Sequence, residues 1–219
     1  MSSYFFFVKK VNKMIELLNI LFNCSIMNKN EKLESLYDAS LQIFAKYGYK
    51  KTTVEDIALK LGTTKGNIYF YVKNKEDLYR RTISYGLIKW KDFVKAGIEN
   101  ETDPEKKFIL LAELAVEYLN NNEDLKSIIR NDPDIYTVKS SEDRFYDINM
   151  EALTLLKNVL SDGVSAGVFT ISNIDYVSHL IYSIYIMYLI QSYGGPQAIS
   201  PDILFNEALT LILRGILVR

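Results

Sequence analysis

Apolar residues recur every three or four positions along most of the chain, which is the spacing of an α-helix with one buried face. The first such stripe begins after Glu31, and Gly48 is expected to end the helix as a C-cap residue. Strict alternation of apolar and polar residues, the pattern of a half-buried strand, is rare. Only 4 prolines and 10 glycines interrupt the 219 residues. The pattern therefore predicts an all-α protein.

Three more helices are predicted next, each after a residue that can cap it. Two short helices begin after Thr53 and Thr64, and Gly62 lies in the turn between them. A long helix begins after Asn74 and runs towards Ile98. Side-chain oxygens of Thr and Asn accept hydrogen bonds from the free N–H groups at a helix start. Two short helices joined by a tight turn predict a helix-turn-helix.

The second half of the chain predicts five further helices. They are expected over residues 108–119, 124–130, 142–163, 174–193 and 203–218. The last two are apolar around most of their circumference, so each needs two buried faces. We expect one face to pack on the domain core and the other on the same two helices of a second subunit, which predicts a homodimer. A monomer that buries both helices itself is the alternative.

Charge is divided unevenly along a chain whose overall net charge is −1. Residues 1–81 hold 14 of the 26 Lys and Arg and 8 of the 27 Asp and Glu, a net charge of +6, which leaves −7 for residues 82–219. Basic segments attract DNA phosphates and acidic segments repel them. We therefore expect the first part of the chain to face nucleic acid.

Two sequence runs resemble the DNA-binding signature of the TetR family of bacterial regulators. Residues 52–58 read TTVEDIA and residues 61–78 read LGTTKGNIYFYVKNKEDL, and the resemblance extends over about residues 31–80. It implies a three-helix helix-turn-helix DNA-binding domain at 28–80, joined to a larger helical ligand-binding and dimerisation domain at 81–219. The implied partners are a palindromic double-stranded DNA operator and a small-molecule effector. The implied function is a transcriptional repressor that the effector releases from DNA.

The start of the second short helix holds the residues expected to read bases. Lys65 and Asn67 lie in its first turn, where a recognition helix meets base edges in the major groove. Gly66 lacks a side chain, which permits close approach to the DNA backbone, and Phe70 shares the face of Asn67 and can contact a thymine methyl. Many family members carry His or another polar residue in place of Phe70, so the operator sequence is not predicted.

A second group is expected to contact phosphates. Tyr69 and Tyr71 match family positions that commonly contact the DNA backbone, and Lys75 matches a phosphate-binding lysine. Thr53 and Thr64 are helix caps first, with phosphate contact as a secondary role. The alternative for the aromatic run at 69–71 is that all three rings lie in the core. Three consecutive helical residues cannot share one face, so we expect at least one ring to be exposed.

The larger lobe is expected to bind a ligand rather than to catalyse. The single histidine and the single cysteine argue against a His-based catalytic site, a metal cluster or a cofactor. An enzyme built on carboxylates and tyrosines, or a regulator without an effector, are the alternatives. The 16 tyrosines and 11 phenylalanines suggest an apolar pocket with a few hydroxyl groups. The candidate ligand-binding residues are Trp90, Phe93, Tyr118, Phe145, His179 and Tyr182.

Residues 1–27 are interpreted as an N-terminal extension. Its apolar region is interrupted by Glu16 and no small-residue cleavage site follows, which argues against a signal peptide. An amphipathic arm is one interpretation, and sequence upstream of a native start at Met27 is another. Residues 174–193 are long enough to cross a bilayer, but their scattered polar side chains favour a buried helix. We therefore expect a cytoplasmic protein that does not enter the membrane.

Overall fold

The computed structural model describes residues 29–132, 135, 143–193 and 200–218. The predicted N-terminal extension and most of the segment around 131–141 lie outside the described residues. Residues 29–51 are helical. Eight helices follow in the described chain: α2 (Val54–Lys60), α3 (Lys65–Tyr69), α4 (Lys75–Ile98), α5 (Pro104–Asn120), α6 (Glu123–Asn131), α7 (Tyr146–Ser165), α8 (Ile174–Tyr193) and α9 (Pro201–Ile216). The predicted all-α fold is confirmed, since the described residues form no strand beyond one isolated bridge between Phe169 and Leu217.

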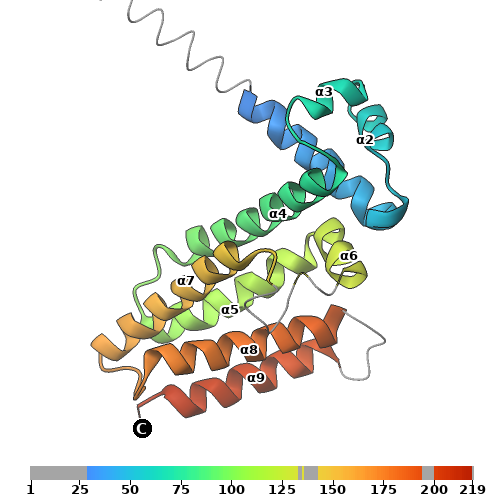
Figure 1. Ribbon diagram of the computed structural model, residues 1–219. Helices are drawn as coiled ribbons and strands as arrows, with labels where there is room; N and C mark the ends of the chain where they lie inside the picture. The colour runs from blue at the N-terminus through green and yellow to red at the C-terminus, as the bar shows by residue number, and fades with distance from the viewer. Residues whose placement is uncertain (1–28, 133–134, 136–142, 194–199, 219) are drawn as a thin grey trace, which may run out of the picture.

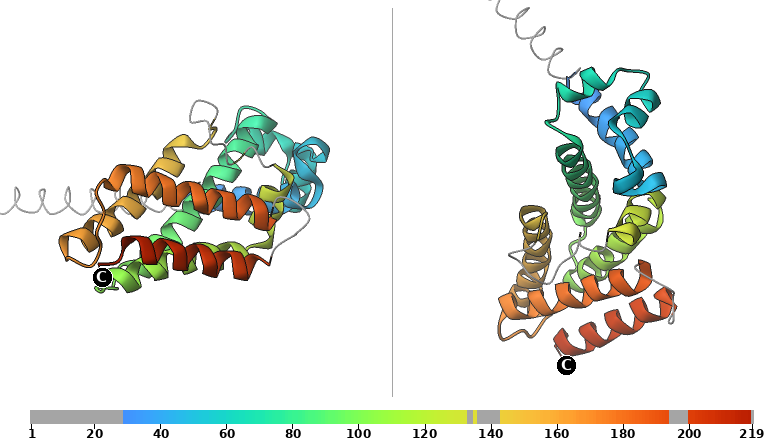
Figure 2. Two further views of the ribbon diagram at one scale, coloured as in Figure 1. Left: turned by 90° about the horizontal axis from the view of Figure 1, so that it is seen from below. Right: turned by 45° about the vertical axis from the view of Figure 1, so that its right-hand side comes forward.

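The helices form two lobes joined by α4 (Figure 1). The smaller lobe, here called the headpiece, comprises residues 29–80: the first helix, α2, α3 and the first turns of α4. The larger lobe, here called the body, contains the rest of α4 and α5 to α9. Figure 2 shows α8 and α9 side by side at the far edge of the body from the headpiece.

Buried aliphatic and aromatic side chains hold the headpiece together. Phe44 of the first helix, Ile57 of α2, Ile68 of α3 and Leu78 of α4 are each at most 1% exposed and belong to one core cluster. The Thr53 hydroxyl accepts a hydrogen bond from the Asp56 N–H, and the Asp56 carboxylate accepts one from the Thr53 N–H. This capping box begins α2 at the predicted residue.

The first helix ends later than Gly48. Gly48 has φ +74°, the left-handed conformation typical of a C-cap glycine, yet residues 49–51 continue the helical pattern. The Thr52 N–H and the Thr52 hydroxyl both donate to the Gly48 carbonyl, at 3.2 and 2.8 Å. The predicted end was therefore three residues early, because these bonds support one further turn. The helix α3 has five residues and ends at Tyr69.

The body is built around the long helices α4, α5, α7 and α8, which pack against one another. Side chains of α4 also complete the headpiece core, so the core cluster is continuous from Phe44 to Leu189 of α8. No helix in the described part of the chain combines the length and the uninterrupted apolar run required to span a bilayer.

We predict that Ile57→Ala lowers the free energy of unfolding by about 2–5 kcal/mol, because it leaves a cavity in the headpiece core. Leu59 lies on the same helix but is 83% exposed, so Leu59→Ala should change this free energy by less than about 0.5 kcal/mol. Urea denaturation followed by circular dichroism measures both values. Equal losses in the two variants would contradict the assigned burial of α2.

Candidate nucleic-acid interface and ligand cavity

The helix α3 turns two residues inward and presents the others to solvent. Ile68 of α3 is 1% exposed and Val72, just after the helix, is 4% exposed, whereas Phe70 at the C-cap is 86% exposed. Asn67 is exposed, and its N–H donates to the hydroxyl of the capping Thr64 at 3.3 Å. A short helix with buried anchors on one side holds its outward side chains in defined positions.

The outward side chains of α3 already have partners within the headpiece. The Lys65 ammonium lies 2.5 Å from the Glu55 carboxylate, and this hydrogen bond raises the pKa of Lys65 and lowers that of Glu55. The Asn67 side-chain amide donates to the Thr63 hydroxyl at 2.9 Å. A Cβ placed on Gly66 would have only the Thr64 hydroxyl oxygen within 4 Å, at 3.8 Å. The chain itself therefore does not require a glycine there, which is consistent with close approach by an outside partner.

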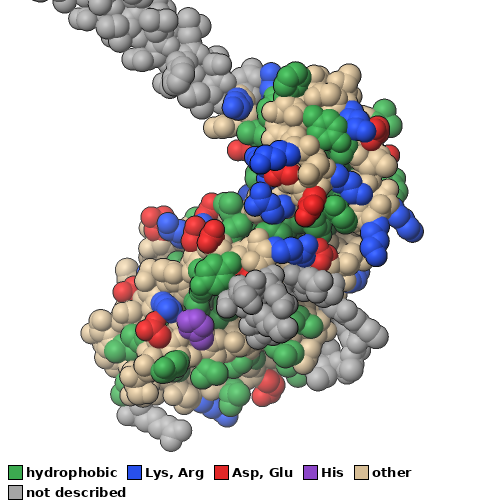
Figure 3. Space-filling model, in the orientation of Figure 1, with side chains coloured by type: hydrophobic (Ala, Val, Ile, Leu, Met, Phe, Trp, Pro, Cys, Tyr) green, Lys and Arg blue, Asp and Glu red, His purple; other side chains and the backbone are tan. Residues whose placement is uncertain are grey.

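The candidate phosphate contacts surround this helix. Thr53, Thr64 and Tyr69 are exposed, while Tyr71 is half-buried against the headpiece core. The Lys75 ammonium lies 4.5 Å from the centre of the Tyr49 ring and 3.4 Å from the Lys50 carbonyl. The described headpiece surface carries many Lys and Arg side chains (Figure 3).

A buried carboxylate joins α3 to α4. Asp77 accepts hydrogen bonds from the Lys73 N–H at 3.0 Å and from the Arg81 guanidinium at 2.9 Å. These bonds hold the pKa of Asp77 below its ordinary value, the bond from Arg81 most of all. The Asn74 side chain caps α4 by accepting from the Asp77 N–H at 2.8 Å. The turn after α3 is thereby tied to the long helix.

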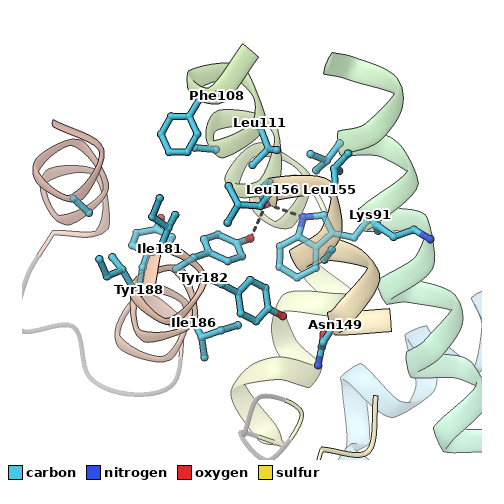
Figure 4. Close-up of a pocket in the computed structure, with 18 of the residues that line it drawn as sticks. Lys91, Phe108, Leu111, Asn149, Leu155, Leu156, Ile181, Tyr182, Ile186 and Tyr188 are labelled. Carbon is cyan, nitrogen blue, oxygen red and sulfur yellow. Dashed lines mark hydrogen bonds between the residues drawn. The ribbon is translucent and has the colours of Figure 1, made fainter. Parts of the chain in front are cut away.

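The body contains a cavity of about 150 Å³ between α4, α5, α7, α8 and α9. Its lining is mostly apolar and includes Trp90, Phe108, Leu111, Ile181 and Tyr188 (Figure 4). The Trp90 indole N–H is satisfied within the wall, since it donates to the Ala115 carbonyl at 2.8 Å. Such a lining suits an apolar molecule.

Two of the six residues predicted to bind ligand, Trp90 and Tyr182, line this cavity. Tyr118 stacks on Trp90 with ring centres 6.3 Å apart, and Phe145 is buried in the core, but neither is among the lining residues. Phe93 is 41% exposed, because it lies on a different side of α4 from the residues that line the cavity.

The placement of His179 in the pocket was wrong. His179 is exposed, and its Nδ1 lies 2.8 Å from the Asp175 carbonyl one turn earlier in the same helix. The cavity is lined instead by α8 residues further along, from Ile181 to Tyr188. Sequence reasoning also missed Asn149 and Tyr185, two polar residues of the lining. No described cluster of three or more His, Cys, Asp or Glu residues is arranged to hold a metal ion.

A polar bridge connects the two lobes. The Tyr79 hydroxyl of α4 donates to Asp132 at 2.7 Å, and the same carboxylate accepts two hydrogen bonds from Arg144, both at 2.9 Å. Burial, and then the bond to Asp132, raise the pKa of Tyr79. The Tyr79 ring packs against Phe44 and Tyr49 of the headpiece, each with ring centres 4.9 Å apart. The ends of α6 and of the segment before α7 are thereby fixed to the headpiece.

Each lobe matches a family model of known proteins. Residues 36–82 match the family model for bacterial regulatory proteins of the tetR family, and residues 87–217 match the model for the C-terminal region of QacR-like proteins. The chain is 26% identical over 141 residues to the uncharacterized HTH-type transcriptional regulator YerO of Bacillus subtilis, and this match covers 64% of the chain but only 49% of YerO. It is 26% identical over 157 residues to the HTH-type transcriptional regulator QacR of Staphylococcus aureus, covering 70% of the chain and 80% of QacR.

A solved structure shares the fold. The transcriptional regulator FadR of Bacillus subtilis, determined in complex with stearoyl-CoA, superposes with a TM-score of 0.70 at 20% sequence identity. The superposition covers 83% of the chain and 98% of FadR.

We predict that Asp77→Asn lowers the free energy of unfolding at pH 7 by about 1–3 kcal/mol, because the charged hydrogen bonds of Asp77 are lost. The pKa of Asp77 is lowered in the folded state, so its contribution is present above the ordinary pKa of about 3.9 and is lost as the pH falls through the folded value. The difference between the two proteins should therefore shrink at pH 3, which urea titrations at both pH values measure. Asp162→Asn, at an exposed position of α7, is the control and should have little effect at either pH. An equal loss for Asp77→Asn at pH 7 and pH 3 would contradict the assigned role of the charge.

Proposed function

Because the chain belongs to the TetR family of bacterial regulatory proteins, we propose that it represses transcription by binding operator DNA as a homodimer and that a small, largely apolar ligand releases it. The observation that carries this proposal is the arrangement of α3. Its buried side anchors it to the headpiece, and Lys65, Asn67 and Phe70 all point outward. An exposed second helix of a helix-turn-helix is the element that enters the major groove.

Base reading is assigned to the first turn of α3. Asn67 can bind adenine through its amide, Lys65 can donate to guanine or phosphate, and Phe70 can contact a thymine methyl. Lys65 must leave Glu55 to do so, and Asn67 must leave Thr63. Glu55 is exposed and Thr63 is half-buried, but both hydrogen bonds lie at the surface, so the exchange takes place in water and costs little.

Phosphate contacts are assigned to residues around α3. Tyr69, Tyr71 and Lys75 are proposed as direct contacts, with Thr53 and Thr64 placing two helix N-termini near the backbone. These contacts position the headpiece without selecting a sequence. Close approach at Gly66 is favoured by the open space around it.

Dimerisation is assigned to α8 and α9. Their outer surface exposes six large apolar side chains, each 40–73% exposed. These are Tyr176, Leu180, Ile184, Met187, Ile203 and Leu211. In α8 they recur every three or four residues, so they form one stripe, and the same stripe of a second copy would cover it. A two-fold pair of recognition helices then fits a palindromic operator.

Ligand response is assigned to the cavity and transmitted by α4. The FadR structure, determined in complex with stearoyl-CoA, supports a ligand that is at least partly apolar. A ligand in the cavity would contact Trp90 and Leu87 of α4, and Tyr79 of the same helix packs on the headpiece. A shift of α4 would change the separation of the two recognition helices, which must match the repeat of about 34–36 Å in the DNA duplex. The ligand must bind the two arrangements with different affinity for this to operate.

We predict that duplexes selected from a random pool by the purified chain share one palindromic sequence, and that affinity for it falls steeply with salt.

Asn67→Ala should relax preference at one base pair in each half-site by about 1–3 kcal/mol, because only that position loses a base contact. Lys75→Ala should weaken binding to all sequences alike and reduce the slope of log affinity against log salt by about 1 per subunit. Titrations of labelled duplexes measure both effects. Undiminished sequence preference in Asn67→Ala would exclude α3 as the reading helix.

We also predict that Leu180→Lys converts the dimer into a monomer, because it places two charges within the apolar interface. Sedimentation velocity measures the mass in solution. Leu59→Lys, which changes a similarly exposed leucine in the headpiece, should leave the dimer intact. A Leu180→Lys protein that stays dimeric would place the interface elsewhere.

A further inference from the structure

Two polar side chains of the cavity, those of Tyr182 and Asn149, lie together at one end. Figure 4 shows the ring of Tyr182, from α8, extending toward Asn149 of α7, while the opposite end is formed by Phe108 and Leu111. The side-chain amide of Asn149 donates to the Asp143 carboxylate at 2.9 Å, so one of its two N–H donors is engaged and the side chain is held in place.

The Tyr182 hydroxyl has no hydrogen bond to any described residue, although the tyrosine lines the cavity. Burial, and then the nearby charge of Asp143, raise the pKa of Tyr182, so the phenol stays protonated and can donate. Tyr182 is half-buried, and an apolar molecule that filled the cavity would bury its hydroxyl without a partner, which is unfavourable. An acceptor on a bound molecule would satisfy it.

The charges around the cavity disfavour a charged ligand. Lys91 alone among the described lining residues carries a charge; its ammonium is paired with Glu151 and Asp92, and Figure 4 shows it pointing away from the cavity. None of the described lining residues is a carboxylate. Asp143, behind Asn149, already accepts from Asn149 and from the Phe145 N–H. A buried cation or anion would therefore lack a free counter-charge.

The volume limits the size of the ligand. An apolar cavity of about 150 Å³ holds a molecule the size of benzene. We infer that the effector is an uncharged, ring-sized molecule with one hydrogen-bond acceptor, and that the Tyr182 hydroxyl donates to this acceptor. This inference rests on the ligand response proposed above and names the chemical class of the ligand.

Three probes of similar size test the inference: cyclohexanone, methylcyclohexane and cyclohexylammonium. Each is titrated by calorimetry into the full chain, into Tyr182→Phe and into Tyr146→Phe, with the emission of Trp90, the single tryptophan, as a second readout. Tyr182→Phe removes only the hydroxyl. Tyr146 lies in the same lobe, at the start of α7, but is 44% exposed and does not line the cavity, so Tyr146→Phe is the matched control.

We predict that cyclohexanone binds the unaltered chain and that Tyr182→Phe weakens this binding about tenfold, the effect of one hydrogen bond. Methylcyclohexane should bind Tyr182→Phe at least as tightly as the unaltered chain, because the hydrocarbon then no longer buries an unpaired hydroxyl. Cyclohexylammonium should bind neither protein, and Tyr146→Phe should match the unaltered chain throughout. The ratio of the cyclohexanone and methylcyclohexane affinities within one protein is independent of the fraction that is folded.

An unchanged affinity ratio in Tyr182→Phe would overturn the inference. Comparable binding of cyclohexylammonium, or no binding of cyclohexanone to the unaltered chain, would overturn it as well. Operator binding is measured separately, with no probe present. Loss of operator binding with intact cyclohexanone binding would contradict the DNA-binding function alone, whereas the reverse result would contradict only the assignment of the ligand.

Discussion

The structure depends on the packing of α4 into two cores at once. Near its start, Leu78 is fully buried among the headpiece helices, and three turns later Trp90 forms part of the cavity wall in the body. A helix is stiff along its axis because each backbone N–H is bonded within it. The headpiece therefore cannot change its angle to the body without altering contacts around Trp90, and the filling of the cavity bears on the same helix.

The bridge through Asp132 adds a second attachment with a different character. Apolar packing of α4 is non-directional and tolerates small shifts, whereas the bonds from Tyr79 and Arg144 to one carboxylate require defined geometry. A displacement of the segment before α7 would break polar bonds before it disturbed the core. Asp143, adjacent in sequence to Arg144, holds Asn149 at the polar end of the cavity, so the bridge and the cavity share one short segment.

Features that depend on local hydrogen bonding were predicted from the sequence, and features that depend on distant contacts were not. Thr53, Thr64 and Asn74 cap their helices as expected, because a free N–H group must be satisfied by a residue close in sequence. The inward position of Ile68 follows from helical spacing. In contrast, Tyr79 and Asp132 lie 53 residues apart, and no local pattern relates them. In α8 apolar and aromatic residues occupy most positions all around the helix, so periodicity does not define a single inward face, and His179 was placed on the wrong one.

The contact between Lys65 and Glu55 has a consequence for how the protein searches DNA. The Glu55 carboxylate occupies the lysine in the free protein as a substitute for a phosphate oxygen. In the proposed complex, Lys65 at an arbitrary sequence would exchange one anion for another and gain little, so random stretches of duplex would hold the headpiece weakly and release it quickly. Only where neighbouring side chains also find matching base edges does the exchange become favourable, and residence is prolonged there. A carboxylate that competes with phosphate in this way would increase sequence specificity, because it weakens non-specific binding to DNA.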